Sequence, residues 1–182
     1  MAVDIAAVER TYRDLLDLLL PGWADDSHTA GTPKRVARWW AEFLDHDPGT
    51  YDTVFPLAHT DQMVVVSGID TWSLCAHHLL PFSTSITVGY LARGKVLGLS
   101  KFARIARMCS HRATTQEALV EGIANLISEV ADTPDVAVVG SGLHLCMAMR
   151  GVRIPATMTT SVARGAFRDD DSCRAEWLSL VR

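Results

Sequence analysis

The sequence predicts an α+β fold with an antiparallel sheet of four strands. Two stretches of strand-like alternation come before a pair of amphipathic helical segments, and two more strand-like stretches come after it. Further helical patterns lie at both ends of the chain. The 182 residues, 48% of them hydrophobic, suffice for one core. We therefore expect a single domain, with an N-terminal helical part over residues 1–60 and the sheet with its helices over residues 61–182.

Two amphipathic helices are predicted in the N-terminal part. Apolar residues recur at helical spacing over residues 5–19, and Pro21-Gly22 ends the pattern. A second helix begins near Thr32, which can serve as its N-cap, with Pro33 at the first helical position. Residues 45–61 are rich in Asp, Pro, Gly and Thr and have no periodicity, so we expect a long connection there.

The first pair of strands follows this connection. Residues 63–74 indicate a strand with an irregularity at Gly68, and this strand delivers Cys75 at its end. After a turn at Pro81, apolar and polar residues alternate over residues 85–90, which predicts the second strand.

Two helices are predicted between the strand pairs. Ser100 can cap the first of them, and Lys101 and Arg104 lie three residues apart on one side of its first turn. Cations are unfavourable at this end of a helix dipole, so the pair indicates a bound anion; a solvated pair is the alternative. The second helix follows Thr114, and Glu117 could complete a capping box with it.

The second pair of strands and a terminal helix complete the pattern. A strand begins at residues 136–139 and, if it continues unbroken, places His144 and Cys146 on the same face. A Thr-rich strand over residues 156–162 and a C-terminal helix follow. Because a sheet of this kind leaves open edges, we expect a homo-oligomer that covers them.

The net charge and the cysteines indicate which partners the protein can bind and in which compartment it acts. The net charge of −4 gives no basic imprint for binding nucleic acid or acidic membranes. No apolar run approaches the roughly 20 residues of a membrane span, and the first ten residues lack a secretory pattern. We expect a cytoplasmic protein whose four cysteines are free thiols or metal ligands.

The densest chemical cluster begins at Cys75, where a thiol and two imidazoles fall within four positions. Cys75 and His78 form a Cys-x-x-His pair, and Cys146 would supply a third ligand. A catalytic zinc usually has three protein ligands and an open position, whereas a structural zinc has four. We favour an open zinc site, with a closed site that recruits His77 or His144 as the alternative.

These residues would support metal-assisted hydrolysis of a phosphorylated substrate. Zinc can make water nucleophilic near neutral pH, and His77 and His144 could transfer protons. The basic group on the second N-terminal helix, which includes Arg35, is more simply a solvated face on spacing alone. Guanidinium and ammonium groups hold phosphates well. The candidates for that role are Lys101, Arg104 and Arg150.

From the second helix to the C-terminus the chain resembles the GTP cyclohydrolase I family. The matching segments, in this order, are residues 32–37, 75–82, 98–105, 116–117 and 144–151. The resemblance implies the tunnelling fold and a homodecamer of two pentameric rings, with active sites at subunit interfaces. It also implies GTP as the substrate.

The resemblance further implies a reaction and a role for each candidate residue. Water activated by zinc would attack C8 of the guanine, the imidazole ring would open, formate would leave, and the ribose carbons would rearrange to 7,8-dihydroneopterin triphosphate. The implied roles are zinc binding by Cys75, His78 and Cys146; proton transfer by His77 and His144; a hydroxyl near the ribose from Ser100; guanine recognition by Gln116 and Glu117; and triphosphate binding by Lys101, Arg104, Arg150 and a neighbouring subunit's Arg35.

The chain departs from the family pattern at several positions. The family usually has Glu where this chain has Ala76 and Gln where it has Thr114, and the loop over residues 154–156 is shorter by one residue. These departures leave two alternatives open. One is a paralogue that acts on another purine nucleotide or stops at a ring-opened intermediate. The other is a nucleotide-binding regulator without turnover.

Overall fold

The computed structural model describes residues 2–57 and 62–181 of the chain. Residues 58–61, at the end of the predicted connection, lie outside the described residues. The chain forms two compact units, Met1–Asp47 and Pro48–Arg182. Within the described residues, no helix combines the length and the apolar character needed to cross a membrane. That the two units act as one domain stays a prediction.

The first unit contains the two predicted N-terminal helices, α1 (Ile5–Leu19) and α2 (Thr32–Leu44). The Asp4 side chain caps α1 by accepting a hydrogen bond from the backbone N–H of Ala7. The two helices pack against each other, and the indole of Trp40 donates to the hydroxyl of Tyr12 at 2.8 Å. Apolar spacing therefore identified both helices correctly.

The predicted cap of α2 is wrong. Gly31 is the N-cap, and Thr32 is already the first helical residue. The hydroxyl of Thr32 instead accepts a hydrogen bond from Nη2 of Arg35 at 2.9 Å, one turn further along the helix. The hydroxyl oxygen of Thr32 is thus hydrogen-bonded to the guanidinium of Arg35, and among the described residues no side chain caps the start of α2.

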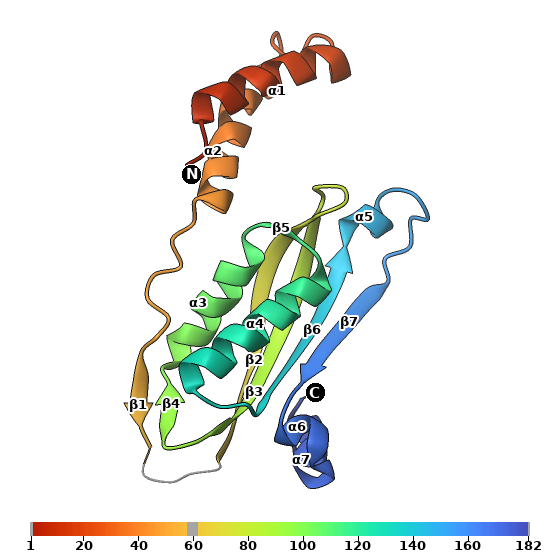
Figure 1. The fold of residues 1–182 in the computed structure, drawn as a ribbon. Helices are drawn as coiled ribbons and strands as arrows, with labels where there is room; N and C mark the ends of the chain where they lie inside the picture. The colour runs from red at the N-terminus through yellow and green to blue at the C-terminus, as the bar shows by residue number, and fades with distance from the viewer. Residues whose placement is uncertain (1, 58–61, 182) are drawn as a thin grey trace. The chain divides into compact units, whose positions relative to one another are not determined.

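In the second unit the predicted α+β fold with four antiparallel strands is confirmed (Figure 1). The β2–β3 hairpin carries a bulge between Val66 and Ile69, where Gly68 has a φ of 72°. A two-residue strand, β5, adds to the sheet in parallel with the end of β2, in the order β5-β2-β3-β6-β7. The strands of the sheet are β2 (Gln62–Cys75), β3 (Pro81–Ala92), β5 (Ala113–Thr114), β6 (Val136–His144) and β7 (Thr157–Ala163).

Two further short strands form a ribbon beside this sheet. β1 (Val54–Pro56) pairs antiparallel with β4 (Lys95–Leu97), and Gly98 donates from its backbone N–H to the carbonyl of Thr53. The sequence did not predict β1, because three residues are too few for a periodic pattern to emerge. The ribbon therefore connects the segment before β1, which begins at Pro48, with the residues just before helix α3, which begins at Leu99.

Helices α3 (Leu99–Ser110) and α4 (Gln116–Ala131) lie across one face of the sheet (Figure 1). Alternate residues of β3, namely Ile86, Val88 and Tyr90, point into the core beneath these helices and are fully buried. The predicted alternation over residues 85–90 therefore identified the buried face of this strand.

The predicted caps of both helices are wrong by one or two residues. Gly98 is the N-cap of α3, so Ser100 lies inside the first turn. The hydroxyl of Thr115 caps α4, while Thr114 lies in β5 and pairs with the end of β2. Because the cap is Thr115, Glu117 is not three residues beyond it and completes no capping box.

β6 is shorter than the unbroken strand that would place His144 and Cys146 on one face. It ends at His144, and the helical turn α5 (Leu145–Ala148) carries Cys146. The physical reason is the length of the neighbouring strand: β3 begins at Pro81, and the last pair in the ladder is Phe82 with His144. Beyond that pair β6 has no partner with which to continue.

The other face of the sheet is partly covered by α6 (Ala166–Asp169) and α7 (Asp171–Leu180). The ring of Trp177 lies directly against Gly89 in β3 and is 4% exposed. Asp135 anchors the start of this region: its carboxylate accepts from the backbone N–H of Ala166 at 2.8 Å and pairs with Arg93. The predicted C-terminal helix is thus present.

Candidate metal centre and substrate site

A tight hairpin turn folds His78 back over Cys75. The backbone N–H groups of His78 and Leu79 both donate to the carbonyl of Cys75, and Leu79 takes a left-handed conformation with a φ of 54°. The N–H of Cys75 donates to the carbonyl of Leu80, which closes the hairpin. The Cys-x-x-His spacing therefore brings both side chains to the end of β2 and β3.

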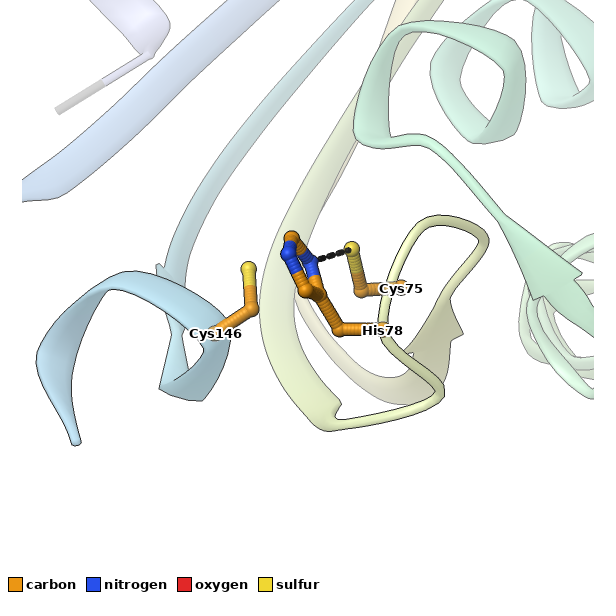
Figure 2. Close-up of side chains that lie close together, drawn as sticks. All are labelled: Cys75, His78 and Cys146. Carbon is orange, nitrogen blue, oxygen red and sulfur yellow. Dashed lines mark hydrogen bonds between the residues drawn. The ribbon is translucent and has the colours of Figure 1, made fainter. Parts of the chain in front are cut away.

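Cys146 meets this pair from the other side, on α5 (Figure 2). The Sγ of Cys75 lies 3.6 Å from Nδ1 of His78, and the ligand atoms of Cys75, His78 and Cys146 all lie within 4.8 Å of one another. These three residues could hold a metal ion. Cys75 is buried, whereas His78 is exposed, so the group opens to one side.

The two thiols affect each other. Burial raises the pKa of the Cys146 thiol above its ordinary value, and its hydrogen bond with the Cys75 thiol raises the pKa further, while the charge of Arg150 opposes both. A bound dication has the opposite effect, because it stabilises thiolates and releases their protons. Arg150 follows two residues after α5, the helical turn that carries Cys146.

His77 lies beside the same group. Its Nδ1 is 3.8 Å from Sγ of Cys75, and its ring meets the ring of His78 edge to face with centroids 6.2 Å apart. The side chain of His77 is exposed. Its ring is therefore open to solvent beside the residues that could hold a metal ion.

His144 is held in one orientation by its neighbours. Its ring stacks on Phe82 with centroids 4.5 Å apart and an angle of 5° between the planes. Its Nε2 lies 2.9 Å from Oε1 of Gln116. Burial lowers the pKa of His144, and the charge of Glu117 acts in the opposite direction.

The fully buried Gln116 determines which nitrogen of His144 carries the proton. Its Nε2 donates to the carbonyls of Gly140 and Met158, both at 3.0 Å, and to the hydroxyl of Thr160 at 3.1 Å. Since that end of the amide faces acceptors, Oε1 must be the acceptor toward His144. Neutral His144 therefore has its proton on Nε2 and a free lone pair on Nδ1.

The sequence did not predict how this amide is accommodated. A side chain at Gly142 would collide with the Gln116 amide and with the carbonyl of Ser83. Gly140 and Gly142 lie two positions apart in β6, and glycines in a strand interior often mark a close approach. That signal could have indicated a buried polar group beneath β6.

The chain gathers most of its predicted site residues at one end of the sheet, which we call the metal end. Glu117, at the start of α4, is exposed there and acts electrostatically on His144. The predicted site residues at the metal end are Cys75, His77, His78, Gln116, Glu117, His144, Cys146 and Arg150.

Ser100, Lys101 and Arg104 do not join this group. They lie on the first two turns of α3, beside the β1–β4 ribbon, and we call this region the cation end. About 15 Å of helix separates Ser100 from Ser110, where α3 approaches the metal end. Lys101 and Arg104 both donate to the carbonyl of Thr50, at 3.0 and 2.9 Å.

Arg35 belongs to the first unit. Its Nη2 donates to the carbonyl of His28 at 2.8 Å and to the hydroxyl of Thr32 at 2.9 Å, and the side chain is exposed. It therefore stabilises the loop before α2. The predicted contact of Arg35 with the substrate of a neighbouring subunit stays a prediction.

The fold and site together define a class of protein: an α+β protein in which an open metal-binding group lies beside titratable side chains, as in metal-assisted hydrolases. Comparison with known proteins specifies the family. The family model described as GTP cyclohydrolase I matches residues 8–182. This chain belongs to the GTP cyclohydrolase I family.

Relatives named GTP cyclohydrolase 1 are similar over nearly the whole chain. The protein of Hyperthermus butylicus is 42% identical over 100% of this chain and 93% of its own length. That of Rhodopirellula baltica is 40% identical over 98% and 80%, and that of Drosophila melanogaster is 41% identical over 94% and 54%. Among solved structures, the archaeosine synthase QueF-Like in the apo form has a TM-score of 0.41 and 16% identity over 54% of this chain and 91% of its own.

Proposed function

We propose that this chain is a zinc-dependent GTP cyclohydrolase that opens the imidazole ring of GTP at C8, releases formate and forms 7,8-dihydroneopterin triphosphate. Family membership supports the activity. The observation that carries the proposal is the open group of Cys75, His78 and Cys146 with His77 beside it. Two sulfur ligands and one imidazole suit zinc, and three protein ligands leave a position for chemistry.

The histidines at the metal end are suited to move protons. When bound, zinc would supply the Lewis acidity that makes water nucleophilic near neutral pH. His144 has a free Nδ1 while Gln116 fixes its Nε2, so it can accept a proton in a defined direction. His77 is exposed beside the ligands and can deliver or remove a proton on the other side.

Recognition of the guanine is best supported for Glu117. Its carboxylate is exposed at the metal end and can accept hydrogen bonds from N1 and the exocyclic amine of guanine together. The amide of Gln116 is engaged within the chain by His144 and two carbonyls. We therefore propose that Gln116 orients His144, and its direct contact with guanine stays a prediction.

The separation of the two ends supports a homo-oligomer, which we propose to be a decamer as in the family. Arg150 lies at the metal end, whereas Lys101 and Arg104 lie at the cation end of the same chain. A substrate bound by both sets needs the metal end of one copy and the cation end of another. In the same arrangement Ser100 would reach the ribose, and Arg35 would come from a further copy.

Incubation of the zinc-loaded protein with GTP tests the proposed activity. We expect formate and a fluorescent pterin to appear in equal amounts, and a Cys146→Ser variant to form both roughly 10³-fold more slowly. Zinc content measured on the same samples separates loss of metal from loss of fold. If the zinc-loaded, folded protein consumes no GTP, the proposal is wrong.

One alternative has an observation in its favour. Ala76 and Thr114, two departures from the family pattern, are neighbours: the N–H of Ala76 donates to the carbonyl of Thr114 at 3.0 Å. The two departures therefore lie together, beside His77. This favours an altered activity, such as action on another purine nucleotide or release of a ring-opened product. Mass spectrometry of the products from GTP and other purine nucleotides distinguishes these. Tight GTP binding without formate release would instead support a regulator without turnover.

All four cysteines are free thiols, which supports a reducing compartment. We propose that the protein acts in the cytoplasm, where its thiols stay available for zinc. Localisation of a fluorescent fusion in intact cells tests this. A fusion found outside the cytoplasm, with its thiols paired, would contradict it.

A further inference from the structure

Lys101 and Arg104 converge on a single residue of the segment before β1. Nζ of Lys101 lies 3.0 Å, and Nη1 of Arg104 2.9 Å, from the carbonyl oxygen of Thr50. The hydroxyl oxygen of Thr50 lies 3.5 Å from each of the same two nitrogens. We call residues 48–53 the strap. One strap residue thus turns both of its oxygens toward both cations.

No carboxylate neutralises this pair of cations within the described residues. The ion pairs found there involve other basic residues, such as Lys95 with Asp132. Lys101 is 8% exposed, so little water is available to screen its charge. The partial charge of a carbonyl offsets only part of the repulsion between two cations. The place between them therefore favours an anion with several negative oxygens.

The strap fits closely against Arg104. Gly49 has a φ of +69°, and a Cβ built on it would lie 2.8 Å from Nη1 and 3.3 Å from Cζ of the guanidinium. A side chain at this position would push the guanidinium away. The absence of a side chain at Gly49 is what allows the strap backbone to lie against Arg104 and turn the carbonyl of Thr50 toward it.

The strap is also tied to the helix that carries both cations. The carbonyl of Thr53 accepts from the N–H of Gly98, which is the N-cap of α3. Immediately after the strap, Val54 pairs with Leu97. Since one end of the strap is fixed to the start of α3, Thr50 and the two cations keep their relative positions.

We propose that Thr50 is a positioning residue for the triphosphate, and that the strap holds Lys101 and Arg104 together at the place where a phosphate group binds. This inference rests on the proposed function, in which these two cations bind the triphosphate of GTP. The hydroxyl of Thr50 lies at the edge of that anion site. A negative charge at residue 50 therefore competes with phosphate for both cations.

Thr50→Asp tests this proposal, with Thr50→Asn as the neutral variant of the same size. We expect KM for GTP to be at least about tenfold higher in Thr50→Asp than in Thr50→Asn, because the new carboxylate pairs with both cations and offsets one of their two positive charges. Inhibition by inorganic tripolyphosphate should weaken in parallel. We expect kcat to change by less than about twofold, since Thr50 does not touch the reacting atoms, and inhibition by guanosine to be the same in both variants.

Arg104→Met separates this inference from the proposed function. If Arg104→Met leaves KM for GTP and inhibition by tripolyphosphate unchanged, the triphosphate role of the cation end fails, and the inference fails with it. If Arg104→Met raises KM for GTP and weakens inhibition by tripolyphosphate, while Thr50→Asp and Thr50→Asn have equal values of both, only the role of Thr50 is wrong. If inhibition by guanosine and inhibition by tripolyphosphate weaken equally in Thr50→Asp, the substitution has disturbed the whole substrate site, and this result would also contradict the inference.

Gly49→Ala gives a second test that does not depend on the folding of Thr50→Asp. Gly94→Ala is its matched control, because Gly94 has a φ of +73° and nothing within 4 Å of an added Cβ. Both variants introduce similar backbone strain. We expect only Gly49→Ala to raise KM for GTP several-fold. Equal KM values in the two variants would overturn the role of the strap.

Discussion

The metal end and the cation end of the second unit are built in different ways. At the metal end a hairpin turn and the helical turn α5 bring the ligand atoms of three residues within 4.8 Å of one another, and a buried amide orients a neighbouring histidine. At the cation end Lys101 and Arg104 both donate to the carbonyl of Thr50, and within the described residues neither forms an ion pair with a carboxylate. One chain thus brings the residues of its candidate metal centre together by itself, whereas its two proposed phosphate-binding cations face the carbonyl and hydroxyl oxygens of Thr50.

Loss of one metal ligand should have the largest effect. We expect Cys146→Ser to lose its zinc and to lower kcat/KM for GTP roughly 10³-fold, because metal chemistry supplies several kcal/mol of transition-state stabilisation. The measurements are zinc content and turnover. Cys173→Ser, which changes a half-buried thiol on α7, is the control and should keep both. A Cys146→Ser variant with full zinc content would contradict the assigned ligand set.

Removal of the aromatic ring behind the sheet should have the next largest effect, on stability. Trp177 is 4% exposed and packs against Gly89, so Trp177→Ala should lower the free energy of unfolding by about 3 to 5 kcal/mol. Leu178, next to it, is 61% exposed, and Leu178→Ala should cost less than about 0.5 kcal/mol. Chemical denaturation measures both. If the two variants lose equal amounts of unfolding free energy, the packing of Trp177 on β3 does not stabilise the fold.

Mixing of inactive variants tests whether the two ends work in different copies. Arg104→Met should raise KM for GTP by about 10 to 100-fold, since a charged hydrogen bond to phosphate is lost. Oligomers assembled from Arg104→Met and Cys146→Ser subunits should regain wild-type behaviour at about a quarter of their sites, because random mixing pairs one intact metal end with one intact cation end. If the mixed oligomers are never more active on GTP than either variant alone, the result would favour a site formed within one chain.

The smallest expected effect concerns the orientation of His144. Gln116→Leu should lower kcat about tenfold, because His144 loses the acceptor that fixes its proton on Nε2. Zinc content should stay at the wild-type value, which separates this role from metal binding. Thr160→Val removes one of three acceptors of the same amide and should lower kcat less. If kcat of Gln116→Leu equals that of the wild type, the amide does not orient the histidine.

Much of the fold followed from local patterns in the sequence. Alternation over residues 85–90 identified the buried face of β3, and Gly68 marked the bulge in β2. Helix starts were less accurate, because the hydroxyl of Thr32 and the backbone of Thr114 take part in contacts that spacing does not reveal. β1 and β5 were missed because strands of two or three residues carry no periodic signal.

For the candidate site, the residue types and their spacing along the chain identified the side chains that can supply the chemistry. The spacing of Cys75 and His78 is local, and one turn of chain suffices to bring them together. How Cys146 joins them depends on the folded sheet, because β6 stops where its partner strand begins and the helical turn α5 follows. It also decided that Lys101 and Arg104 lie at the other end and meet Thr50. These contacts join residues about fifty positions apart in the chain, and only folding brings such residues together.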